Sequence, residues 1–248
     1  MTVASKPTDE FYGALTRAYA HFNKRLFNGQ LPACLITAQR QRNVMGYFSK
    51  NRWNNGAGDV VHEIALNPSY FGNHKIIEVF QTLVHEQCHL WQHEFAKPSR
   101  GGYHNKQFAE RMLAIGLVPS DTGAPGGKTT GQRMSDYPDP DGLFLKACKE
   151  LARSDNVLPW VDRFPAYRES CQVRESSTDG ENDNNIQSDV ENILFADFTV
   201  LIPSVENDTP PPVAKNKVKY SCIDCGINVW GKTGLNLACT DCDMELVS

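Results

Sequence analysis

The sequence predicts an α+β fold for roughly the first 150 residues, followed by a small separate unit at the C-terminus. Three observations support this prediction. Apolar residues follow helical spacing in segments 8–28 and 74–95. Between these segments lie three short β-prone runs bounded by turn residues. The segment 215–248 contains two closely spaced cysteine pairs.

The predicted elements alternate between helices and short strands. Thr8 is the expected cap of the first helix, and Gly29 ends it. The turn signal Asn54-Asn55-Gly56 precedes the third strand. In order, we expect a helix at 8–28, strands at 33–38, 44–49 and 60–66, and helices at 74–95, 105–115 and 143–153.

Composition divides the chain into three expected parts: a domain at 1–153, a largely disordered linker at 154–214, and a cysteine unit at 215–248. The linker contains an acidic stretch nearly free of hydrophobic residues and the stiff spacer NDTPPPV. Between them, ILFADFTVLIP (193–203) is an edge strand docking on a domain, a binding segment, or a locally ordered piece of linker.

The charge is unevenly distributed along the chain. Residues 1–150 carry 17 Lys and Arg against 13 Asp and Glu, whereas residues 151–214 carry 4 against 12. The basic N-terminal part permits a nucleic-acid partner without demanding one. No apolar run approaches the roughly 20 residues that cross a bilayer, and no secretory signal is evident. We therefore expect a cytoplasmic protein without a membrane partner, and a nucleoid association is compatible with this; the oligomeric state stays open.

Residues 85–89, HEQCH, match the metal-binding pattern H-E-x-x-H. Residues four apart on a helix lie about 5–6 Å from each other on one face, so His85 and His89 can reach the same ion. Glu86 projects about 100° around the helix from His85 and can contact a water at that ion instead. The pattern predicts a zinc site with two histidine ligands and a neighbouring base.

A catalytic zinc needs a third protein ligand. His93 lies about 12 Å along the helix from His85, too far to share one ion, and is interpreted as a bystander. Glu94 could reach the same ion only if the helix had an unusual bend. His104 follows the turn Gly101-Gly102 and approaches from a separate element, which makes it the better candidate.

Two further motifs are rejected. His62-Glu63 begins like the metal motif, but Leu66 stands where the second histidine belongs, and the segment alternates as a strand. Gly127-Lys128-Thr129 lacks the first glycine and the flanking strand and helix of a phosphate-binding loop.

The order helix, three strands, HEQCH helix and then GYHNKQF resembles the SprT-like family of zinc metalloproteases, which includes Spartan. The resemblance covers roughly residues 8–152 and extends to the C-terminus. It implies a compact zincin-type fold, with helices on a three-stranded sheet, in which the strand His62–Asn67 lines the substrate cleft. It also implies that His85, His89 and His104 bind the catalytic zinc. Glu86 would be the catalytic acid and base, taking a proton from zinc-activated water.

The C-terminal cysteines have the spacing C-x₂-C-x₁₃-C-x₂-C, typical of a zinc ribbon. Four thiolates complete the coordination of zinc, so this second zinc would be structural. Gly226 after the first pair suits a tight turn, whereas Asp243 after the second departs from that pattern. The predicted ligands are Cys222, Cys225, Cys239 and Cys242.

The same segment combines basic and aromatic residues suited to single-stranded nucleic acid, although four acidic residues cancel its charge. The aromatic residues of this segment are Tyr220 and Trp230. The candidate contacts are Lys215, Lys217, Lys219, Trp230 and Lys232.

We therefore expect a zinc-dependent endopeptidase whose protein substrates are associated with DNA, either single-stranded or protein-crosslinked; the DNA connection comes mainly from the resemblance. Two alternatives remain: a nucleic-acid-binding or regulatory protein with a non-catalytic metallo-domain, and a narrow-specificity peptidase without a DNA role. The acidic stretch 175–191 is a candidate autoinhibitor of a basic cleft.

Overall fold

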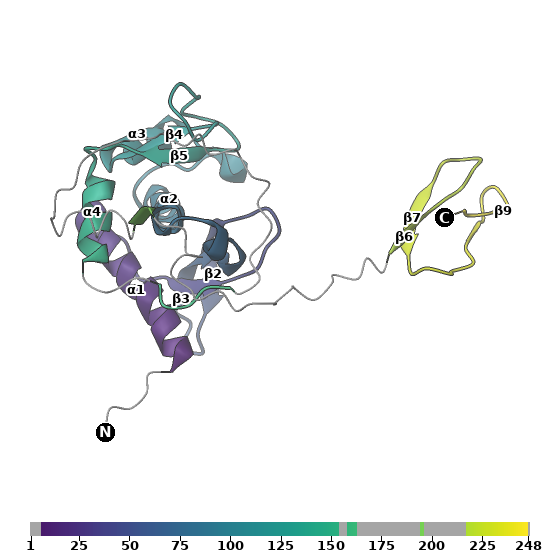
Figure 1. The fold of residues 1–248 in the computed structure, drawn as a ribbon, viewed down its shortest axis with the longest axis horizontal. Helices are drawn as coiled ribbons and strands as arrows, with labels where there is room; N and C mark the ends of the chain where they lie inside the picture. The colour runs from purple at the N-terminus through teal and green to yellow at the C-terminus, as the bar shows by residue number, and fades with distance from the viewer. Residues whose placement is uncertain (1–5, 154–157, 163–193, 196–216, 248) are drawn as a thin grey trace, which may run out of the picture. The chain divides into compact units, whose positions relative to one another are not determined.

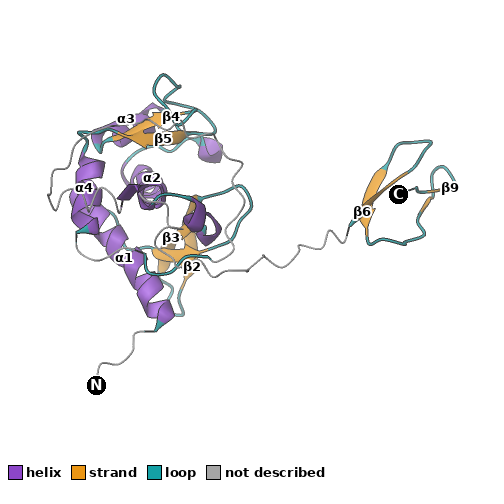
Figure 2. Ribbon diagram, viewed as in Figure 1, coloured by secondary structure: helices purple, strands orange, loops and turns teal. Residues whose placement is uncertain are grey.

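The computed structural model describes residues 6–153, 158–162, 194–195 and 217–247. The chain divides into two units, Met1–Ser204 and Val205–Ser248. In the described ranges the first unit contains four α-helices and small sheets, which confirms the α+β prediction (Figures 1 and 2). None of the described helices combines the length and apolar character that a membrane span requires. The predicted linker lies outside the described residues, apart from 158–162 and 194–195.

The first helix, α1 (Pro7–Leu26), begins one residue earlier than predicted. Pro7 occupies its first turn, where the missing N–H costs nothing, so the expected cap Thr8 lies inside the helix. Acidic residues in its first turn and basic residues in its last turn complement the helix dipole.

A three-stranded sheet follows α1, in the order β1-β3-β2. β1 (Leu35–Ala38) pairs in parallel with β3 (Val60–Leu66), and β2 (Gly46–Asn54) pairs with β3 in antiparallel orientation. β2 extends beyond its predicted end because a register shift between Ser49 and Trp53 lets it continue. In this order β3 is the central strand, and β2 pairs on one side only, so it is an edge strand of the sheet.

The central helix, α2 (Ile76–Phe95), runs between this sheet on one side and α3 with β4 and β5 on the other (Figure 1). It follows the 3₁₀ helix η1 (Pro68–Asn73) and starts two residues later than predicted. The Glu78 carboxylate accepts a hydrogen bond from the Lys75 N–H at 2.9 Å, which satisfies one free donor at the start of the helix.

The segment after α2 contains two strands that the sequence did not predict. A short turn η2 (Arg100–Gly102) leads into α3 (Lys106–Ala114), and then β4 (Leu117–Ser120) pairs with β5 (Ser135–Pro138). The prediction treated most of this region as an irregular connection because it is rich in Gly, Pro and Asp. The last helix, α4 (Leu143–Ala152), matches its prediction within one residue.

The hydrophobic core joins helices that are far apart in sequence. Phe22 of α1 has its ring centroid 5.4 Å from that of Phe80 in α2 and 5.9 Å from that of Phe144 in α4. All three rings are almost completely buried. Leu158 and Leu194, from the predicted linker region, are also buried in this core.

Within residues 217–247, the C-terminal unit contains two small hairpins. β6 (Val218–Ser221) pairs with β7 (Asn228–Gly231), and β8 (Ala238–Cys239) pairs with β9 (Met244–Glu245). Val247 also bridges to Ser221, which ties the end of the described chain back to β6.

Gly116, which follows α3, lies in close contact with the backbone at Gly142. Gly116 has φ +83°, and a Cβ there would lie 2.7 Å from Gly142 Cα. Gly126 has φ +89° with open space around it. We expect Gly126→Ala to lower the free energy of unfolding by about 1–2 kcal/mol, the cost of the left-handed backbone. Gly116→Ala should lower it by more, because the added Cβ also clashes with Gly142. Urea unfolding of both variants measures the difference, and equal losses would contradict the close approach.

Candidate metal centres

An open cleft of about 1280 Å³ runs along α2. One wall is formed by residues 43–48 and Lys50, at the start and edge of β2, and the other by parts of 98–104 and 122–136. The expectation that the strand His62–Asn67 lines the cleft is therefore wrong. That strand is the centre of the sheet, and the free edge of β2 borders the cleft instead.

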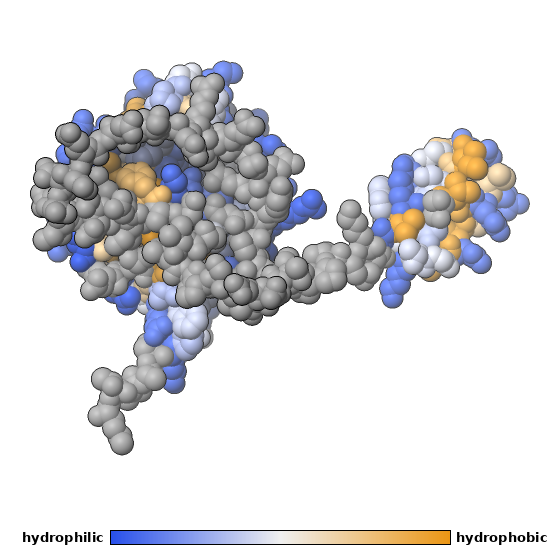
Figure 3. Space-filling model, in the orientation of Figure 1, coloured by the Kyte–Doolittle hydropathy of each residue, from blue (hydrophilic) through white to orange (hydrophobic). Residues whose placement is uncertain are grey.

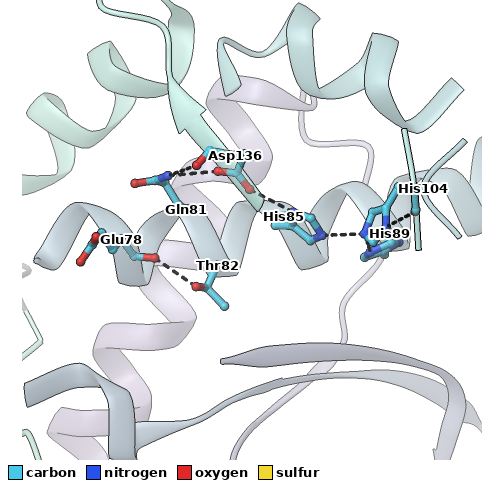
Figure 4. Close-up of polar contacts among 8 residues, drawn as sticks. Glu78, Gln81, Thr82, His85, His89, His104 and Asp136 are labelled. Atoms are coloured by element: carbon cyan, nitrogen blue, oxygen red, sulfur yellow. Dashed lines mark hydrogen bonds and ion pairs between the residues drawn. The ribbon is translucent and has the colours of Figure 1, made fainter. Parts of the chain in front are cut away.

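Three histidines converge at the cleft wall. His85 and His89 lie one turn apart on α2, and His104 reaches the same point just before α3. The Nε2 atom of His104 lies 3.0 Å from that of His85 and 3.1 Å from that of His89 (Figure 4). The three groups thus meet where the sequence placed a metal site.

Hydrogen bonds on the far side of two rings fix which nitrogen carries the proton. The Asp136 carboxylate accepts from His85 Nδ1 at 3.1 Å, and the Gly131 carbonyl accepts from His104 Nδ1 at 3.2 Å. Both Nε2 atoms therefore point lone pairs at each other. A shared cation stabilises such an arrangement, and two nitrogens that share a tetrahedral zinc lie about 3.4 Å apart. The residues fit a zinc ion.

Phe108 forms the floor of this cluster. Its ring centroid lies 5.1 Å from that of His85, 4.4 Å from that of His89 and 4.7 Å from that of His104, and its side chain is completely buried. The ring restricts the rotation of all three imidazoles. This contact gives the phenylalanine four residues after His104 a physical role.

Burial keeps two of the imidazoles neutral. Burial and, to a smaller extent, the neighbouring His85 lower the pKa of His89 to about 2 and that of His104 to about 4. Burial also lowers the pKa of His85, but the hydrogen bond to Asp136 and the charge of Glu86 outweigh it, so that this pKa is raised. Neutral imidazole is the form that binds metal.

Glu86 is 7% exposed and lines the cleft. Burial is the main reason that the pKa of its carboxyl group is raised to about 7, and the charge of Asp136 adds to the rise. His85 and the hydrogen bond from the Phe48 N–H act in the opposite direction. A group with this pKa can accept and return a proton near neutral pH.

A second group, His62, His93 and Glu94, also brings three possible ligand atoms together. The Asn51 N–H donates to His62 Nδ1 at 2.9 Å, so neutral His62 carries its proton on Nε2 and donates it to Glu94 at 3.0 Å. This ring has no free lone pair for a metal. We interpret the group as hydrogen-bonded support at the C-terminal end of α2, with His93 at the cleft and away from the triad.

In the C-terminal unit, the sulfur atoms of the four predicted cysteines lie within 4.8 Å of one another. The N–H of Cys225 is the main reason that the pKa of Cys222 is lowered to about 7, whereas contact with Cys225 raises that of Cys242 to about 12. Four such thiols would lose their protons to solvent when zinc binds, because thiolate is the form that binds the metal. The cluster fits a zinc ribbon.

The two cysteine pairs have more similar backbones than their sequences suggest. Gly226, after the first pair, has φ +70°, and Asp243, after the second, has φ +53°. Aspartate tolerates this left-handed conformation better than most residues do. The turn after the second pair is therefore kept without glycine.

The ribbon residues predicted to contact nucleic acid differ in exposure. Trp230 is 63% exposed and stands opposite Lys219 in the β6–β7 register, and Lys217 and Lys232 are exposed. Tyr220 is buried and donates its hydroxyl to the Lys232 carbonyl, so it cannot stack on a base. Lys215 lies outside the described residues. Figure 3 shows apolar residues at the surface of this unit.

Sequence reasoning missed Asp136 and Gly131, which hold His85 and His104. The residues lie 51 and 27 positions from the histidines that they contact. No local spacing rule connects positions so far apart. A prediction of the β4–β5 hairpin would have been the only available signal, because Asp136 belongs to β5.

We expect the purified chain to bind two zinc ions. His104→Ala should leave one, because the ribbon keeps its own, and the matched variant His93→Ala should leave two, because its neighbour His62 offers no free lone pair. Elemental analysis of dialysed protein counts the ions. Three ions in the wild type, or one in His93→Ala, would contradict this assignment.

Comparisons with known proteins agree with this geometry. Residues 15–127 match the model of the SprT-like family, which is generally of metalloprotease type. A Salmonella typhimurium protein named "Uncharacterized protein in mucB 3'region" is 51% identical over 47 residues, which is 19% of this chain and 64% of that relative. No solved structure matches the chain. Residues 15–127, which include the three histidines and Glu86, therefore form a domain of the SprT-like family.

Proposed function

We propose that the first unit is a zinc-dependent endopeptidase in which His85, His89 and His104 hold the metal and Glu86 is the general base. The observation that carries this proposal is the convergence of three imidazole Nε2 atoms at a cleft that Glu86 also lines. A zinc ion there would supply a Lewis acid that polarises a carbonyl and lowers the pKa of water.

The protein groups have distinct tasks in this proposal. Glu86 accepts the proton of the attacking water and returns it to the leaving amine, a role suited to a buried carboxyl group with a pKa of about 7. The Gly131 carbonyl accepts a hydrogen bond from the His104 ring at Nδ1. The backbones of the two residues also exchange hydrogen bonds of 2.8 and 3.1 Å. These bonds keep the site fixed while the substrate enters.

The substrate is an extended polypeptide. β2 is an edge strand, and residues 43–48 border the cleft, so a peptide adds to this edge through backbone hydrogen bonds. Recognition through backbone groups demands little of the substrate sequence. It requires a segment without secondary structure of its own.

We further propose that the ribbon brings the peptidase to DNA-associated proteins. Trp230 offers an exposed ring for base stacking, and Lys219 lies beside it for a phosphate contact. This role rests on the ribbon surface alone and not on the position of the two units.

Glu86→Gln tests the chemistry. The amide has the size of the carboxylate but cannot accept the proton, so we expect zinc content to be retained and cleavage to fall at least 100-fold. Cleavage of an unfolded protein substrate is followed by gel, with and without single-stranded DNA. Unchanged cleavage would exclude Glu86 as the base. A wild type that binds DNA and zinc but cleaves nothing would favour a regulatory protein with a non-catalytic metallo-domain.

Trp230→Ala tests the DNA contact. Loss of one stacked base costs about 1–3 kcal/mol, so we expect affinity for a labelled oligothymidine to fall roughly 5- to 150-fold in fluorescence anisotropy. Trp53→Ala is the matched control, because Trp53 is 43% exposed but lies on β2 in the first unit. Equal effects of the two substitutions would sink the proposed ribbon contact.

A further inference from the structure

Asp136 lies on β5, outside residues 15–127 that match the family model. Its side chain is 8% exposed. It belongs to a hairpin whose partner strand, β4, follows α3. A carboxylate buried at this depth needs partners that replace water.

Two residues one turn apart on α2 provide these partners. His85 Nδ1 lies 3.1 Å from Asp136 Oδ2, and Gln81 Nε2 donates to Asp136 Oδ1 at 3.1 Å. Gln81 also donates to the Asp136 backbone carbonyl at 3.2 Å. Figure 4 shows these groups in a row from Gln81 through Asp136 to His85 and on to His104.

The hydrogen bond to Asp136 determines the orientation and tautomer of His85. A carboxylate only accepts hydrogen bonds, so the His85 proton must be on Nδ1 and the Nε2 lone pair faces the other histidines. His62 on β3 shows the opposite result, because a backbone N–H at its Nδ1 forces the proton onto Nε2. The partner at Nδ1 therefore decides whether a histidine in this protein can bind metal through Nε2.

We propose that Asp136 is a positioning residue for the metal centre. It holds His85 in the metal-binding tautomer through its Oδ2 atom, whereas the bonds from Gln81 to its other oxygen and its carbonyl tie β5 to α2. The proposal rests on the proposed function to the extent that the triad binds zinc. It adds a residue beyond the H-E-x-x-H helix, and it makes the β4–β5 hairpin part of the site.

A purely structural role is the competing explanation, because the same bonds tie β5 to α2. Gln81→Ala separates the two: it removes two ties between the elements but leaves the Asp136–His85 hydrogen bond in place. Asp136→Asn removes the charge and leaves a single acceptor oxygen, for which His85 Nδ1 and Gln81 Nε2 compete. Asp141→Asn, an exposed change after β5, serves as the control.

The first measurement is zinc affinity. Full-length protein is titrated with a competing chelator, and the zinc retained per chain is counted, with the ribbon as an internal reference. We expect Asp136→Ala to weaken the triad site 10- to 100-fold, the usual effect of losing such a partner. Asp136→Asn should weaken it less, and Gln81→Ala and Asp141→Asn should stay within about threefold of the wild type.

The second measurement is the tautomer of His85 in metal-free protein, read from the ¹⁵N shifts of its ring. We expect a proton on Nδ1 in the wild type and a mixture of both tautomers in Asp136→Ala. A purely structural role would leave the tautomer unchanged.

The outcomes separate this inference from the proposed function. If wild-type protein binds no zinc at the triad, the proposed function itself fails. If the wild type binds zinc and cleaves, but Asp136→Ala leaves both zinc affinity and tautomer unchanged, only the positioning role is overturned. An equal loss of affinity in Gln81→Ala and Asp136→Ala would likewise overturn it in favour of the structural role.

Discussion

The burial of α2 between two layers is the constraint on which the rest of the first unit depends. A helix enclosed in this way needs partners for most of the polar groups that it carries inward. Gln87 donates to the Tyr19 carbonyl of α1 at 3.0 Å, and Gln92 donates to the Asn105 side chain at 2.7 Å. Together with Gln81, these bonds fix the rotation of α2 about its axis. The same rotation directs His85, Glu86 and His89 towards the cleft.

Helical periodicity made much of this centre predictable. The 3.6-residue period placed His85 and His89 together, and the rise of the helix separated His93 from them. The glycine turn before His104 explained how a third histidine could return to the same point. Each inference used distances of a few residues or one short turn. Within that range backbone geometry leaves few choices, and the described positions agree with it.

The features that could not be predicted depend on contacts between distant segments. The β4–β5 hairpin consists of two four-residue strands in a region rich in turn residues, so local preferences gave no strand signal. The exposure of Trp230 and the burial of Tyr220 depend on which face of a two-stranded hairpin packs inward. A one-residue shift in register would move the side chains of one strand to the opposite face. Alternating patterns this short leave that choice open.

The residues that support the candidate metal centre lie in the β4–β5 hairpin and not in the H-E-x-x-H motif. Gly131 and Asp136, five residues apart, each hold one of the three histidines. Both lie beyond residues 15–127, the range that the family model matches. A fragment ending at residue 127 would contain every group of the motif, yet two of its imidazoles would lose the partners that orient them. The boundary of the family match thus separates the three histidines from two of the groups that orient them, so a substitution in the hairpin can alter this cluster without changing any of its histidines.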